Sequence, residues 1–181
     1  MKKRFGFFIV LWLVCSIAPT MASDVSVLIN LSEQQAYLLE DNHVILTSPI
    51  SSGRTGWSTP HGSFQVISKD VDHRSRSFGA VVDGKGQVVN SNATPASRVP
   101  RGGHFREAPM PFYMEFSPAV GMHGGYLPGY PASHGCVRMP RDMAARFFQR
   151  VQVGTKVNVV GTTSDLTDVR KALPVVSFGR R

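Results

Sequence analysis

Residues 122–140 of the chain read MHGGYLPGYPASHGCVRMP. This stretch holds a cysteine, Cys136, and two histidines, His123 and His134, separated by glycines and prolines. Glycine and proline favour turns, so the segment is predicted to be a loop that returns Cys136 to the side of His123. A thiol with an ordinary pKa of ~8.5 is mostly protonated at neutral pH, and a neighbouring imidazole that takes its proton makes it a nucleophile. Nucleophilic catalysis is therefore the first functional hypothesis.

The residues around Cys136 suit an acyl-transfer site. In an extended segment, side chains two positions apart point to one face, which predicts His134 and Arg138 on the face of Cys136. Arg138 can hold a substrate carboxylate through two parallel hydrogen bonds. Gly135 leaves room for an approaching carbonyl group, and its backbone N–H can join that of Cys136 in stabilising an oxyanion.

Two other interpretations stay open at this point. A single cysteine is commonly a buried, inert residue, and a histidine in a strand is commonly a hydrogen-bonding core residue. His123, His134 and Cys136 also form a ligand set that zinc accepts. No fourth ligand stands at a helpful spacing, so no metal and no other cofactor is predicted.

The N-terminus has the order of a secretory signal peptide. Three cations at positions 2–4 precede an apolar run at 5–17 and small residues at 18–22, which predicts cleavage after Ala22. The apolar run has 13 residues, too few to span ~30 Å of hydrocarbon at ~1.5 Å per residue. Residues 1–22 are therefore predicted to be a signal peptide, and the protein to be exported to the periplasm or cell envelope without a permanent membrane anchor.

Removal of the signal peptide would change the cysteine count and the net charge of the chain. Cys15 leaves with the signal peptide, so Cys136 enters an oxidising compartment with no internal disulfide partner. The net charge falls from +8 to +5 because three cations leave with residues 1–22. The remaining cations are scattered and lack interleaved aromatic residues, which predicts no binding of nucleic acid. A mildly basic surface suits an anionic or carboxylate-rich substrate.

The mature chain is long enough for one domain, predicted at residues 23–161. Short apolar runs and alternating patterns predict β-strands at 25–29, 36–40, 43–47, 63–67 and 156–160. Asp41 and Asn42 are predicted to turn a hairpin. One helix is predicted from near Pro140 to Gly154. Its apolar stripe, at steps of three and four, consists of Met143, Ala144, Phe147, Phe148 and Val151.

Two segments show no clear periodicity of hydrophobic residues. Residues 70–108 are polar and rich in glycine and charge, which predicts long loops around one or two short strands, forming a rim or lid over the active site. Residues 162–181 are polar and then basic, and are predicted to be a poorly ordered tail.

The string Ser133 to Met139, SHGCVRM, with His123 and Gly124 upstream, resembles the signature of the L,D-transpeptidase catalytic domain, the YkuD domain. Three further stretches resemble that domain in the same order: its opening strand pair, its Thr-Pro-x-Gly-x-Phe segment and the strand before its active site. These stretches are 29–37, 59–64 and 110–114. The resemblance covers residues 24–161.

The resemblance implies a mainly β, sandwich-like fold with one short helix after the catalytic cysteine. It implies that Cys136 is the nucleophile, that His123 is the proton acceptor and donor, and that the Gly124 carbonyl orients the imidazole. The oxyanion site and pocket would be formed by Ser133, His134 and Gly135. Arg138 and Tyr113 would bind substrate.

The implied reaction takes place on peptidoglycan stem peptides. Cys136 would attack an L,D peptide bond of a tetrapeptide stem, release the terminal D-alanine and pass the acyl group to an amine. The amine would belong to a second stem or to a protein that becomes attached to the wall. An L,D-carboxypeptidase that uses water as the acceptor is the alternative. A wall-binding module without catalysis is a less favoured one.

Overall fold

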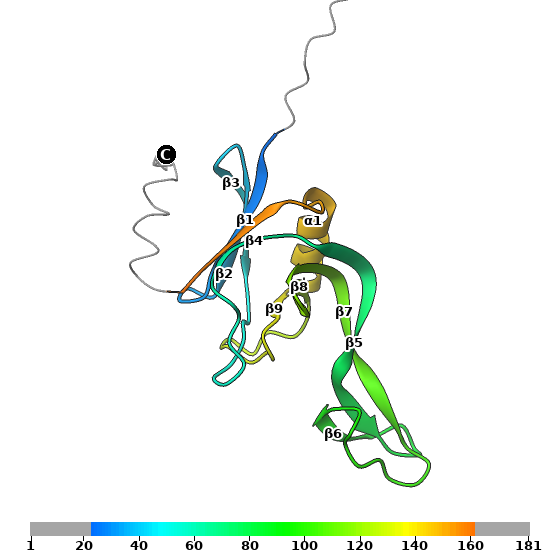
Figure 1. The fold of residues 1–181 in the computed structure, drawn as a ribbon. Coiled ribbons are helices and arrows are strands. Elements are labelled where there is room, and N and C mark those ends of the chain that lie inside the picture. Colours follow the sequence, from blue (N-terminus) through cyan, green and yellow to red (C-terminus); the bar gives the residue numbers. More distant parts are fainter. Residues whose placement is uncertain (1–22, 162–181) are drawn as a thin grey trace, which may run out of the picture.

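The structure, a computed structural model, describes residues 23–161. The predicted signal peptide, residues 1–22, and the predicted tail, residues 162–181, lie outside the described residues and stay predictions. The described part contains two five-stranded β-sheets and one helix (Figure 1). No helix in this part of the chain is long and apolar enough to cross a membrane.

The first sheet has the strand order β3-β2-β1-β10-β4. Its strands are β1 Val25–Asn30, β2 Gln35–Glu40, β3 His43–Pro49, β4 Gly62–Gln65 and β10 Lys156–Val160. Only β1 and β10 are parallel. The hairpin between β2 and β3 turns at Asp41 and Asn42, whose φ angles are 49° and 64°. Two consecutive positive φ angles are typical of the tight two-residue turn, so this predicted hairpin is confirmed.

The second sheet has the strand order β6-β5-β7-β8-β9. Its strands are β5 Ser68–Val82, β6 Val88–Ala93, β7 His104–Ser117, β8 Val120–Gly124 and β9 Val137–Met139. All neighbouring strands are antiparallel except β8 and β9, which run parallel. The two strands that carry the signature motifs are therefore neighbours at one edge of this sheet.

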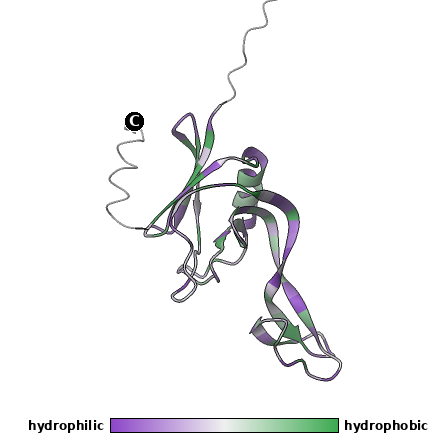
Figure 2. Cartoon of the chain, in the orientation of Figure 1, coloured by the Kyte–Doolittle hydropathy of each residue, from purple (hydrophilic) through white to green (hydrophobic). Residues whose placement is uncertain are grey.

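Residues 70–108 differ from the prediction of long loops. They form most of a twisted arm of β5 and β7, strands of 15 and 14 residues, with the short strand β6 at the far end. Figure 1 shows the arm leaving the rest of the fold, and Figure 2 shows hydrophobic segments mixed with hydrophilic ones along it. Much of β5 is exposed, so the usual alternation of buried and exposed residues is absent. That is why the sequence pattern indicated loops.

The predicted helix is confirmed, and it is shorter than expected. It is α1, Arg141–Arg150, and Pro140 is the residue before its first turn. Val151 is extended, so the helix ends at Arg150, four residues before Gly154. Its buried face, Ala144 and Phe147, packs in one core cluster with residues of both sheets.

The chain after β3 joins the first sheet to the edge strand β9. Ser51 and Arg138 exchange two backbone hydrogen bonds of 2.9 and 3.0 Å. Three positions later the Arg54 N–H donates to the Ser133 carbonyl at 3.1 Å. The loop that contains Cys136 is therefore held by a segment from the other sheet.

Phe147 tests the shared core, because it is fully buried where α1 meets both sheets. Phe147→Ala should lower the free energy of unfolding by about 3–5 kcal/mol, the usual loss when a buried phenylalanine leaves a cavity. Urea denaturation measures the change. Val153→Ala, at a side chain that is 63% exposed, is the control and should change stability by less than about 0.5 kcal/mol.

Candidate active site

Cys136 lies at the end of a tight bend that leads into β9. Gly135 has φ +113°, a backbone conformation that side-chain-bearing residues rarely adopt. Ser133 closes the bend, since its hydroxyl donates to the Cys136 carbonyl and accepts from the Gly135 N–H at 3.1 Å. The Gly135 N–H is thus occupied. This corrects the expectation that it joins Cys136 in stabilising an oxyanion, and leaves the Cys136 N–H for that role.

Thr59 holds the same bend from the loop that precedes β4. Its hydroxyl donates to the Gly135 carbonyl at 2.7 Å and accepts from the Gly53 N–H at 2.9 Å. The side chain is 2% exposed, so both bonds are shielded from water. Sequence reasoning noted Thr59 only as part of a motif, and the structure shows which contacts the motif makes.

His123 is the histidine that the bend brings toward Cys136. It is buried in β8, and its Nδ1 lies 3.0 Å from the Gly124 carbonyl. Nδ1 must therefore carry the proton in the neutral ring, which leaves Nε2 as a base. Burial, and then the positive charges of Arg138 and His73, lower the pKa of His123 to about 4, against the raising effect of the Gly124 carbonyl. The imidazole is neutral at pH 7.

The Cys136 thiol is also neutral at rest. Burial raises its pKa, and the Glu115 carboxylate adds to this, while a hydrogen bond with the Gly121 backbone and the charge of Arg138 lower it. The thiol donates a weak hydrogen bond to the Ala119 carbonyl at 3.8 Å. Both groups line one cavity in their neutral forms, so a reaction in which the sulfur attacked would move the proton during the attack rather than beforehand.

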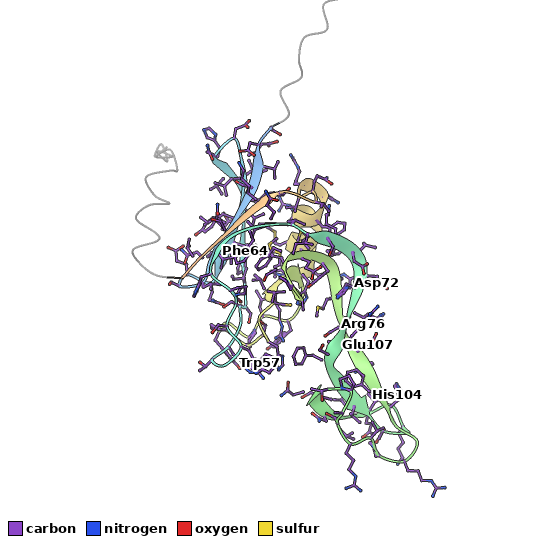
Figure 3. The ribbon with its side chains drawn as sticks, viewed as in Figure 1. Trp57, Phe64, Asp72, Arg76, His104 and Glu107 are labelled. Carbon is purple, nitrogen blue, oxygen red and sulfur yellow. The ribbon has the colours of Figure 1, made fainter. Side chains whose placement is uncertain are left out.

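His134 belongs to the wall of the site. Its ring stacks on Phe78 of the arm at 4.0 Å and meets Trp57 edge-on at 5.0 Å. Its Nε2 lies 2.7 Å from Nη2 of Arg54, an obligate donor. Figure 3 labels Trp57 in the loop before β4. His134 is thus a neutral hydrogen-bond acceptor, and burial, followed by Arg54 and Arg138, lowers its pKa.

The zinc alternative finds two of its four ring nitrogens already engaged in this arrangement. Nε2 of His134 is occupied by Arg54, and Nδ1 of His123 by Gly124. In residues 23–161, no group of three His, Cys, Asp or Glu side chains lies close enough to bind one metal ion.

Most of the predicted residues share one cavity of about 920 Å³, a volume typical of small-molecule sites. The lining includes six of them: Tyr113, His123, Ser133, His134, Cys136 and Arg138. Gly124 and Gly135 lie behind the wall and act through backbone groups. The parallel register of β8 and β9 places His123 opposite Arg138, and so brings the base and the cation together.

Tyr113 lies under the cavity floor on β7. Its ring stacks on His73 at 4.2 Å and lies 6.3 Å from His123. Burial raises its pKa, a Cys136 thiolate would raise it further, and the Glu115 carboxylate adds to the effect, so the phenol stays protonated and can donate a hydrogen bond. Gly121 makes room for this ring, because a Cβ at that position would lie 2.6 Å from it.

The arm supplies site residues that sequence reasoning missed, among them His73, Arg76 and Phe78. The pairing of β5 with β7 jumps between Arg74 and Gly79, so residues 75–78 bulge out of the strand. The Ser75 hydroxyl closes the bulge by accepting from the Phe78 N–H at 3.0 Å. Figure 3 labels Arg76 on this part of the arm. The bulge brings Phe78 against His134, and no local sequence pattern marked it.

Comparisons with known proteins identify the family. The family profile of the L,D-transpeptidase catalytic domain, YkuD, matches residues 24–159. The chain belongs to the YkuD family. L,D-transpeptidase 1 of Mycobacterium tuberculosis is 32% identical to it over 124 residues, which are 67% of this chain and 44% of that protein. The chain therefore spans less than half of the length of this curated relative.

Solved YkuD structures confirm the mainly β fold. The catalytic domain of the E. faecium L,D-transpeptidase has a TM-score of 0.55 and 26% identity, covering 77% of this chain and 99% of that one. An L,D-transpeptidase in complex with imipenem has a TM-score of 0.57 and 23% identity, covering 76% and 59%. The L,D-transpeptidase from Mycobacterium smegmatis reaches 0.59 at 17% identity, again covering 76% and 59%. The predicted family and fold class are thus both confirmed.

The lowered pKa of His123 has a consequence for stability. The unfolded chain binds a proton near pH 6.5 and the folded chain only near pH 4, so stability is full above about 6.5 and falls as the pH drops toward 4. One pKa unit is worth about 1.4 kcal/mol, so the loss should reach about 3 kcal/mol.

Urea denaturation from pH 7.5 to 4 measures this loss, and His123→Gln should remove that part of the pH dependence. His43→Gln, at an exposed histidine, is the control and should leave it in place. Parallel profiles for wild type and His123→Gln would contradict the buried, neutral state of His123.

Proposed function

We propose that this YkuD protein is a peptidoglycan L,D-transpeptidase that carries the acyl group of a stem peptide as a thioester on Cys136. One observation carries the proposal: the unpaired Cys136 thiol lines one cavity with His123, a neutral imidazole oriented through Nδ1 by the Gly124 carbonyl. A nucleophile, a base and a group that orients the base form the usual constellation for covalent catalysis. The family membership supports the same reading.

Acylation then follows from the protonation states. Nε2 of His123 takes the thiol proton as the sulfur attacks the carbonyl carbon of the L,D bond. The negative charge that develops on the carbonyl oxygen is stabilised by the Cys136 N–H and by the protonated Tyr113 hydroxyl. The C–N bond breaks, and imidazolium returns the proton to the leaving amine of D-alanine. The thioester remains, and His123 is again neutral.

Arg138 recognises the acyl donor in this proposal. A stem peptide carries carboxylates, and Arg138 is a half-buried cation on the same cavity wall. Its charge also lowers the pKa of Cys136. One guanidinium therefore favours both the bound carboxylate and the ionised sulfur.

The proposed partners are peptidoglycan stem peptides, with the amine of a second stem or of a wall-attached protein as the acceptor. We also propose export, on the signal-peptide pattern of residues 1–22. The unpaired thiol suits that setting, because Cys136 has no second cysteine in residues 23–161 with which to form a disulfide.

Imipenem provides the direct test, since an L,D-transpeptidase of the same fold has been solved with it. The mature chain should gain the mass of one imipenem molecule in intact-mass spectrometry. Cys136→Ala should gain none, and Cys136→Ser far less than wild type, because serine is a poorer nucleophile for this base. His123→Ala should slow labelling ~10²- to 10⁴-fold. Thermal melting checks that each variant folds, and labelling of Cys136→Ala would refute the thioester.

Arg138 gives a second test, on a tetrapeptide stem. Arg138→Ala should raise KM more than Arg138→Lys, which keeps the charge and loses only the two-pronged geometry. Steady-state release of D-alanine measures both constants. Arg146→Ala, at an exposed arginine of α1, is the control. An equal KM in the two Arg138 variants would reject the carboxylate contact.

A further inference from the structure

The turn between β7 and β8 reaches the nucleophile through a single residue, Ala119. Its carbonyl accepts the hydrogen bond of the Cys136 thiol at 3.8 Å. Its N–H donates to Oε1 of Glu115 at 2.9 Å. Ala119, Glu115 and Cys136 all line the active-site cavity. Ala119 thus contacts the Glu115 carboxylate through its N–H and the Cys136 sulfur through its carbonyl.

The backbone of Ala119 is in an uncommon conformation. Its φ is +60°, the left-handed region, which a residue with a Cβ occupies only where its surroundings impose it. The Glu115 hydrogen bond is such a constraint, because it fixes the N–H. The Ala119 carbonyl is then directed to the sulfur rather than to a partner in the sheet.

Glu115 carries a charge that no neighbouring cation balances. Its second oxygen accepts from the Ser68 hydroxyl at 2.7 Å, and within residues 23–161 no Lys, Arg or His nitrogen forms an ion pair with it. Lys69, its neighbour in the cavity lining, turns its ammonium to the carbonyls at the end of α1. Within the described residues, no ion pair therefore neutralises the Glu115 carboxylate beside the cavity.

This charge does not help acylation. The Glu115 carboxylate raises the pKa of Cys136 and of Tyr113, so it opposes ionisation of the nucleophile. The half-buried Glu115 carboxylate hinders the first step and has no cation as a partner. It is better suited to a later step, in which a cationic substrate enters the cavity.

We propose that Glu115 and the Ala119 carbonyl form the subsite for the ammonium group of the acyl acceptor, and that they select an amine over water. The proposal rests on the proposed function, since it concerns the second half of the same reaction. In the free enzyme the Cys136 thiol donates its hydrogen bond to the Ala119 carbonyl. Acylation removes that proton from the sulfur, so the carbonyl becomes free beside the thioester. An ammonium, with three N–H donors, matches this carbonyl and the carboxylate together.

The transfer step balances with the groups already present. The acceptor enters as an ammonium ion and gives one proton through Glu115 to solvent. The nitrogen lone pair attacks the thioester carbonyl carbon, and Nε2 of His123 takes the second proton. A C–N bond forms, the C–S bond breaks, and the sulfur recovers that proton from the imidazolium. The thiol and the neutral imidazole of the resting state are restored.

Glu115→Gln is the decisive variant, because glutamine has the same shape and can keep hydrogen bonds to Ala119 and Ser68 without the charge. Purified enzyme is mixed with a tetrapeptide stem as donor and a tripeptide stem with a free side-chain amine as acceptor. Mass spectrometry measures the thioester and the ratio of cross-linked to hydrolysed product.

In the variant this ratio should fall at least about tenfold, as expected for the loss of one charge-assisted hydrogen bond. The thioester should form as fast as in wild type or faster. Glu107→Gln, the same change at an exposed position of the same strand (labelled in Figure 3), is the matched control and should leave the ratio unchanged.

An unchanged ratio in Glu115→Gln, with thioester formation intact, would overturn the subsite. Absence of any thioester in wild type would instead refute the proposed function, so the two failures are distinguishable. If Glu115→Gln does not fold, wild type provides the test with an acceptor analogue that carries a hydroxyl in place of the amine. The inhibition constant of the analogue should be at least about tenfold higher than the dissociation constant of the amine acceptor. Equal constants would overturn the proposal.

Discussion

The parallel pairing of β8 with β9 is the constraint on which the site depends. It sets Met122 opposite Val137 and His123 opposite Arg138, so that the residue before β9, Cys136, comes beside Gly121, two positions before His123 on β8. Parallel neighbours cannot be joined by a tight hairpin, because the chain must first travel back along the strands. The loop of residues 125–136 makes that return, and its glycines and prolines let it do so without a helix.

A loop of this kind needs support from outside its own sheet. Thr59 and Ser51 reach it from the segments around β3 and β4, through hydrogen bonds to Gly135 and Arg138. The arm closes the other side, where Phe78 stacks on His134. Each support is buried or partly buried, and the cost of leaving a buried polar group unpaired makes the contacts mutually dependent. The loop that contains Cys136, the proposed nucleophile, is therefore held by segments that connect to both sheets.

In the proposed reaction, the charged groups around the cavity act at different steps. Burial keeps His123 and Cys136 neutral at rest, so that in the proposed reaction the proton stays on the sulfur until a substrate carbonyl arrives. Arg138 favours the developing thiolate, whereas Glu115 opposes it. Opposite charges near one sulfur are consistent with two substrates of opposite charge, an acyl donor with carboxylates and an acceptor with an ammonium group.

The sequence by itself determined the family, the mainly β class, the first three strands and the helix, and it marked Cys136 and His123 as candidates for one site, because residue type and short spacing encode each of these. Only the tertiary structure decided that residues 70–108 form an arm, that the Gly135 N–H is occupied and that Glu115 lies beside the thiol. These features depend on contacts such as that between Ser68 and Glu115, 47 positions apart. Hydrophobic periodicity describes how a segment meets the core. It carries no information about which distant strand pairs with an exposed one, so the arm and its residues came only from the fold.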